Sequence, residues 1–132
     1  MDSAHIPFSF PDVYQGLATG SGIATATPAG LTLEFQVQDG FFGVIKSGIK
    51  KVEIPLGELY SVAFEEGWFR NRLLIKVRRM TTLAEVPGSS TDKVELRVAR
   101  RDKVMAQTLA SLLMLNLSQK QLAELGRNGL EA

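Results

Sequence analysis

The segment from residue 31 to residue 38 alternates strictly between apolar and polar side chains. A period of two places one set of side chains in a core and the other set in water, as in a β-strand with one buried face. The apolar positions are Leu31, Leu33, Phe35 and Val37, and the polar positions are Thr32, Glu34, Gln36 and Gln38. This alternation predicts a sheet with one face on a core.

The same alternation recurs along the chain and predicts about seven short strands. The repeats lie at residues 52–56, 60–64, 73–77 and 94–98, and residues 23–27 are joined to the first segment through Pro28-Ala29-Gly30, which predicts a hairpin. Pro55 cannot donate to a strand ladder, so it indicates an edge strand or a strand end. Residues 80–86 fit either a short strand or irregular structure. Many short strands with turns between them are typical of a sandwich or barrel.

Residues 1–22 contain two prolines and three glycines, which favour extended backbone and resist helix. We therefore expect an extended N-terminal arm over 1–22, which docks on the body or on a neighbour. The main domain is then predicted to span residues 23–117.

After the last strand the pattern changes to that of a helix. Residues 103–117 lack glycine and proline and are rich in Ala, Leu and Met. Ser118 with Gln121 resembles a capping box, which predicts a second short helix and tail over 118–132.

The predicted main helix is too apolar for one contact. Residues 112–115 are four consecutive apolar residues and cover most of the helix circumference, whereas a helix on a sheet needs an apolar stripe a little over 100° wide. The second face is covered by the short terminal helix, by the N-terminal arm or by another subunit. For the last alternative, the residues expected to mediate self-association are Leu112, Met114 and Leu115.

Several segments together resemble the bacterial pleckstrin-homology-like, or GRAM-like, domains. These are Leu31-Thr-Leu-Glu-Phe-Gln-Val, Val52-Glu-Ile-Pro-Leu, Gly67-Trp68-Phe69 before Leu73-Leu-Ile-Lys-Val, and Val94-Glu-Leu-Arg-Val-Ala-Arg-Arg-Asp running into the helix. The resemblance covers residues 23–117. It implies a mainly β fold with a C-terminal helix: two near-orthogonal antiparallel sheets of about seven strands, capped by one helix. It also implies a non-enzymatic role in ligand binding, membrane association or assembly, although a fold alone does not fix function.

Eukaryotic relatives of this family bind phosphoinositides with basic residues on the first two strands and the loop between them. Here that loop is residues 27–30, and neither it nor its flanks are basic. The resemblance therefore does not predict inositol-phosphate binding by that mode.

The first candidate binding segment combines aromatic residues with lysines. Aromatic side chains can enter a membrane interface while ammonium groups meet lipid phosphates. The alternative is an ordinary strand or turn with buried phenylalanines and solvated lysines. The residues are Phe41, Phe42, Lys46, Lys50 and Lys51.

The second candidate is a turn that carries the only tryptophan of the chain. A hairpin tip with Trp and Arg suits recognition of a partner or ligand, since these residues are enriched at interaction hot spots. The alternative is a tryptophan that packs on the rim of the sheet beside solvated arginines. The residues are Trp68, Phe69, Arg70 and Arg72.

The chain lacks the residues of the common catalytic and metal sites. It has no cysteine, and its only histidine is His5, in the predicted arm. A nucleophile-and-base pair, or a zinc site, would need more ligands of these types. We therefore expect no catalytic residues, no metal and no cofactor, and thus not an enzyme.

Composition and charge complete the prediction. The net charge of +1 gives little attraction to phosphate, so we do not expect nucleic acid as a main partner. No stretch approaches the roughly 20 apolar residues of a membrane span, and the N-terminus lacks signal-peptide features. We expect a cytoplasmic binding or assembly module whose partner is another protein or itself. The alternative is peripheral binding to anionic lipid, and the third is weak anion or nucleic-acid binding.

Overall fold

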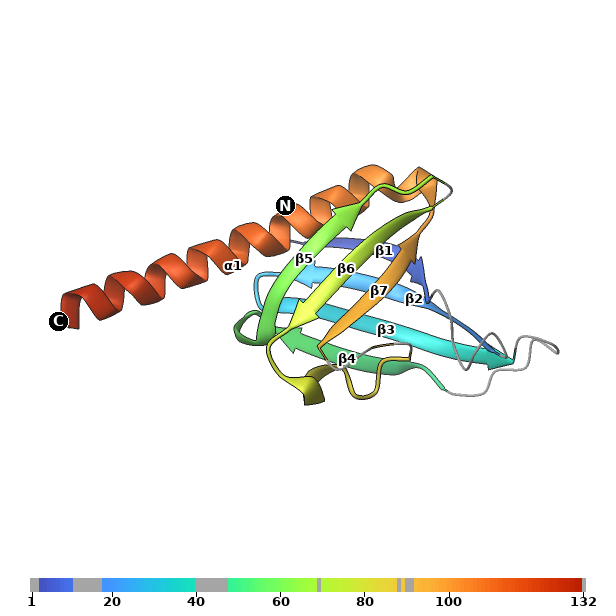
Figure 1. Cartoon of the computed structure of the whole chain (residues 1–132), viewed down its shortest axis with the longest axis horizontal. Coiled ribbons are helices and arrows are strands. Elements are labelled where there is room, and N and C mark those ends of the chain that lie inside the picture. The colour runs from blue at the N-terminus through green and yellow to red at the C-terminus, as the bar shows by residue number, and fades with distance from the viewer. Residues whose placement is uncertain are drawn as a thin grey trace.

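The computed structural model describes residues 3–10, 18–39, 48–68, 70–87, 89 and 92–131. This part of the chain forms one antiparallel sheet of seven strands and a long C-terminal helix (Figure 1). The strands are β1 (Ala4–Ser9), β2 (Ala18–Thr27), β3 (Gly30–Asp39), β4 (Lys50–Pro55), β5 (Leu59–Glu65), β6 (Asn71–Val77) and β7 (Lys93–Val98). Short 3-10 helices η2 (Leu56–Glu58), η3 (Met80–Leu83) and η4 (Arg100–Asp102) precede β5, follow β6 and lead into α1 (Lys103–Glu131).

All seven strands belong to one sheet, in the order β4-β3-β2-β1-β7-β6-β5. In Figure 1, β5, β6 and β7 run across the direction of β2, β3 and β4. The two halves are joined through β1 and β7, which pair at Ser9↔Arg97 within the residues that the structure describes. The prediction of a mainly β fold with a C-terminal helix is confirmed. The prediction of two separate sheets is not confirmed. The strand pairing gives a single sheet, because the segment predicted to be an arm contains β1, which connects the two halves of the sheet.

The segment expected to be an N-terminal arm contains a strand of the sheet. Strand β1 pairs with β2 along its whole length, and β2 itself begins at Ala18, inside the predicted arm. The side chains of Ala4, Ile6, Phe8 and Phe10 are buried in the core. Pro7 is tolerated because β7 pairs with β1 at Ser9 and at no other described residue of β1, so the missing N–H of Pro7 interrupts no ladder on that side.

The predicted hairpin between β2 and β3 is confirmed. The two strands pair from Ala18↔Asp39 to Thr27↔Gly30. Gly30 has a φ of 147°, and a Cβ there would lie 2.2 Å from the carbonyl oxygen of Ile54 on β4. Only glycine therefore fits at this end of the hairpin.

The two outer strands, β4 and β5, differ in how their free edges are closed. Strand β4 ends at Pro55, as the sequence predicted for an edge strand. On β5, the backbone N–H of Val62 donates a hydrogen bond of 3.4 Å to Sδ of Met114, so α1 covers that edge. A register shift between Leu59 and Ser61 turns Tyr60 out to solvent, although the alternation had grouped it with Val62.

The first half of α1 closes the core. Its inward face packs on β1, β2 and β5, while η3 and the following turn add Leu83 and Val86 to the same core. The core-facing residues of α1 are Ala106, Leu109, Ala110, Leu113 and Leu117. Their spacing of three and four residues is that of one helical face.

The second half of α1 continues without a break, contrary to the prediction of a separate short helix from Ser118. The helix runs for 29 residues, and Figure 1 shows its C-terminal half extending beyond the sheet. Residues 118–127 are all exposed. The Ser118–Gln121 pair resembles a capping box, but serine and glutamine also fit an exposed helix interior. No glycine or proline lies between Ser118 and Gly126 to end the helix. We call residues 118–131 the overhang.

The burial of one face of α1 predicts that alanine substitutions of Leu113 and Leu115 change the free energy of unfolding by very different amounts. Leu113→Ala should lower the free energy of unfolding by about 2–5 kcal/mol, because the side chain is fully buried. Leu115→Ala should change the free energy of unfolding of a single chain by roughly 0.5 kcal/mol or less, since Leu115 is 54% exposed there. Urea denaturation of both variants measures the difference, and equal losses would contradict this packing.

Candidate functional site

The turn between β5 and β6 is fastened to the start of α1. Trp68 is 83% exposed, and its carbonyl oxygen accepts a hydrogen bond from the guanidinium of Arg100. The ammonium of Lys103 lies 2.8 Å from a carboxylate oxygen of Glu66. This hydrogen bond and the positive charge of Lys103 hold the pKa of Glu66 below its ordinary value.

The residues predicted to form a recognition turn lie in different surroundings. The guanidinium of Arg72 makes ion pairs with Glu65 at 2.7 Å and Glu95 at 3.0 Å across three strands. Arg70 is exposed, and Phe69 lies outside the described residues. Trp68 and Arg70 are therefore exposed at the turn, whereas Arg72 pairs with carboxylates of its own sheet.

The predicted aromatic and lysine segment is described only at its end. Phe41, Phe42 and Lys46 lie outside the described residues. Lys50 is exposed, and Lys51 makes an ion pair of 3.3 Å with Glu53 on the outward face of β4. Beside them Ile49 is 72% exposed.

The three residues predicted for self-association lie in different environments. Leu112 and Met114 are partly buried and pack against the core of their own chain. Leu115 points outward. The outward face of the helix is therefore the one available to a second molecule.

This outward face carries no charge from residue 104 to residue 122. Its positions are spaced alternately by four and three residues, the average of 3.5 found where two helices pack along their length. All six are exposed, and Val104 and Leu122 are 70% and 66% exposed. We call this set the outer seam: Val104, Thr108, Ser111, Leu115, Ser118 and Leu122.

The opposite face of the overhang is charged instead. Lys120 and Glu124, one helical turn apart, make an ion pair of 2.9 Å. Lys120, together with the charges of Arg127 and Arg78, holds the pKa of Glu124 below its ordinary value. In the overhang the charges of Lys120 and Glu124 therefore lie towards the sheet, whereas the apolar Leu122 faces away from it, the reverse of the usual polarity of a surface helix.

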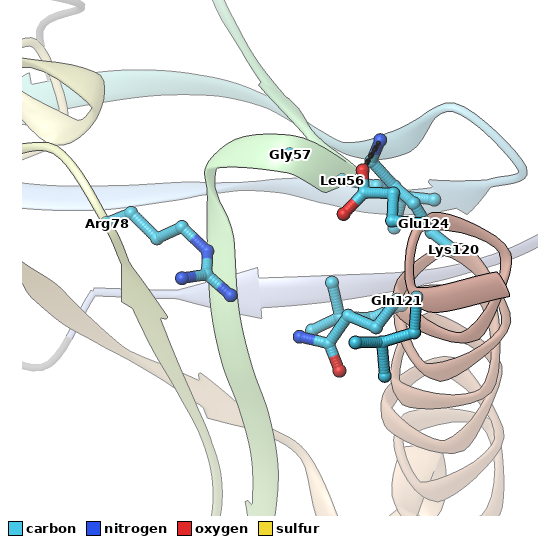
Figure 2. A pocket seen from close by; sticks show the side chains of 8 residues that line it. Leu56, Gly57, Arg78, Lys120, Gln121 and Glu124 are labelled. Carbon is cyan, nitrogen blue, oxygen red and sulfur yellow. Dashed lines mark hydrogen bonds and ion pairs between the residues drawn. The ribbon is translucent and has the colours of Figure 1, made fainter. Parts of the chain in front are cut away.

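A groove of about 520 Å³ lies between the overhang and the turn from β4 to β5. Figure 2 shows Arg78 and Gln121 on opposite sides of it, with the Lys120–Glu124 pair near Leu56. The lining residues are Leu56, Gly57, Arg78, Leu117, Lys120, Gln121, Glu124 and Leu125. The groove therefore combines leucine side chains with charged groups.

The described residues hold no cluster of three or more His, Cys, Asp or Glu side chains that could bind a metal ion. His5 is exposed on β1. In the same part of the chain, no helix is both long and apolar enough to cross a membrane.

No protein-family model, curated protein or solved structure matches this chain.

The sequence held a signal for the outer seam but none for the groove. The uncharged positions at alternating spacings of four and three are visible in the sequence. The four consecutive apolar residues 112–115 obscure them, because these residues cover most of the helix circumference. Arg78 reaches the groove only because β6 ends beside η2, where its backbone N–H donates to the carbonyl of Glu58 at 2.8 Å. That placement depends on the folded sheet.

The Glu66–Lys103 pair predicts a pH dependence with a definite sign. A carboxyl group whose pKa is lower in the folded state stabilises the fold above its unfolded pKa, and this stabilisation is lost as the pH falls through the folded pKa. Lys103→Met should raise the pKa of Glu66 towards its ordinary value and remove that contribution. Carboxyl chemical shifts in an NMR titration measure this. Lys120→Met is the matched control: it should raise the pKa of Glu124 and leave Glu66 unchanged.

Proposed function

We propose that this chain is a non-catalytic assembly module of the pleckstrin-homology-like type, in which two copies associate through the outer seam of α1. The observation that carries the proposal is the uncharged, exposed seam along a 29-residue helix. Seven antiparallel strands with one closing helix support the type of fold. The seam covers 18 residue steps, or roughly 27 Å of helix at 1.5 Å per residue.

A second copy fits this seam because the seam is complementary to itself in the antiparallel direction. The two-fold axis crosses the seam at the level of residue 113 along the helix. Val104 then faces Leu122 of the other copy, and Ser111 faces Leu115. The small hydroxyl residues Thr108 and Ser118 face each other. Every leucine then meets a smaller side chain, so the two helices can approach closely, and antiparallel helix dipoles also favour this direction.

A charge in the seam should separate the two copies. Leu115→Glu with Leu122→Glu would place two carboxylates in an apolar contact, so we expect the mass in solution to fall from two chains to one. Light scattering coupled to gel filtration measures it. Ala123→Glu adds a carboxylate to the overhang away from the seam and should leave the mass unchanged. A native protein that is monomeric at high micromolar concentration would refute the proposal.

The antiparallel direction makes a separate prediction. Thr108→Cys and Ser118→Cys variants, mixed and oxidised, should form a disulfide between the two different chains. Each variant alone should cross-link poorly, because like positions lie ten residues apart along the helix, roughly 15 Å. Denaturing gels without reductant read the result. Efficient cross-linking of Thr108→Cys with itself would instead indicate parallel helices.

A second candidate function is peripheral binding to anionic lipid, and the exposed Ile49 beside Lys50 and Lys51 favours it. An apolar side chain next to ammonium groups suits the headgroup boundary of a bilayer. Ile49→Ser with Lys50→Glu should weaken co-sedimentation with phosphatidylserine vesicles at low salt. Lys93→Glu, on β7, is the charge-matched control and should have little effect. Absence of native binding at low salt would exclude this function.

A further inference from the structure

The groove under the overhang contains a guanidinium that makes no ion pair with a described carboxylate. The ion pairs among the described residues do not include Arg78. Its side chain is exposed, and its guanidinium carbon lies 5.5 Å from the ring centre of Tyr60. This contact with the ring helps to orient the arginine while its hydrogen-bond donors stay available for a ligand.

Three neighbouring cations are occupied, and a fourth, Arg127, does not line the groove. Lys76 lies 4.0 Å from Asp92, Arg79 lies 3.8 Å from Glu58, and Lys120 lies 2.9 Å from Glu124. Arg78 is therefore the group in this region best placed to receive an anion from outside. A guanidinium matches a carboxylate with two parallel hydrogen bonds.

The helix side of the groove supplies apolar contact. Leu117 forms part of the core, and one and two helical turns further along the overhang are Gln121 and Leu125. Leu125 is largely exposed. A ligand with its charged end at Arg78 and an apolar body on these leucines would remove Leu125 from water.

Glu124 limits the charge of such a ligand. Its carboxylate lies on the wall of the groove and is held in the charged form by Lys120, with Arg127 and Arg78 contributing. It would repel a second negative charge on the ligand. The groove therefore favours a monoanion over a phosphate monoester.

We propose that this groove binds a small aliphatic monocarboxylate, with its carboxylate on Arg78 and its chain on Leu117 and Leu125. The volume of about 520 Å³ lies in the range of small-molecule sites. All lining residues of the groove belong to one chain. Leu117, Lys120 and Glu124 lie towards the sheet, and Leu125 borders the outer seam three residues after Leu122. The assignment therefore does not rest on the proposed self-association.

The test is calorimetric titration of the full chain with octanoate, octanol and octyl phosphate below their micelle-forming concentrations. Octanoate should bind more tightly than either of the others. Arg78→Gln should weaken octanoate binding about tenfold or more, and Leu125→Ser should weaken both octanoate and octanol. Arg79→Gln, next in sequence but paired with Glu58, is the matched control and should bind octanoate as the native protein does. Circular dichroism checks that each variant is folded.

Three results would overturn the assignment. The first is no heat of binding with octanoate, or equal binding by native protein and Arg78→Gln. The second is tighter binding of octyl phosphate than of octanoate. The third is loss of octanoate binding in the Leu115→Glu, Leu122→Glu variant, which would mean that one chain does not hold the site alone. Retained octanoate binding in that variant would support the single-chain groove whatever its mass in solution.

Discussion

The burial of one face of α1 is the interaction on which the rest of this structure depends. Leu109, Leu113 and Leu117 fill the space towards which both halves of the seven-stranded sheet turn their apolar faces. Without these side chains the sheet would expose its core, because strands alone do not close it. The same contact fixes the rotation of the helix about its axis. It thereby decides which residues face water, and so places the outer seam opposite the sheet.

The overhang brings the two proposed recognition surfaces onto one element. The seam and the groove adjoin on the same helix, where Leu125 of the groove follows Leu122 of the seam by three residues, and the helix is continuous from the core to both. A helix end with no sheet beside it adds little to a core, and residues 118–127 are all exposed. Its apolar side chains, Leu122 and Leu125, therefore find their burial only against something outside the core. This is the physical basis of both proposals.

Local patterns predicted much of the fold, and long-range pairing accounts for what they missed. Alternation identified β3, β4, β6 and β7, and the loss of alternation marked the start of the helix. Strand β1 was missed because the two prolines and three glycines of residues 1–22 outweighed the alternation of Ala4, Ile6 and Phe8. The joining of the halves into one sheet depends on the Ser9↔Arg97 pair, which links residues far apart in the chain. The groove likewise needs the end of β6 beside the overhang.

The two outer strands restrict how copies of this chain can meet. An unpaired strand edge invites addition of a further strand, and repeated addition produces open-ended fibres. On β5 the N–H of Val62 donates its hydrogen bond to the sulfur of Met114. Strand β4 ends in a proline and carries the ion pair of Lys51 and Glu53. Growth of the sheet from one molecule into the next is thus opposed at both edges. A helix–helix contact with two-fold symmetry uses the same surface on both copies, so it produces a dimer and cannot continue into a fibre.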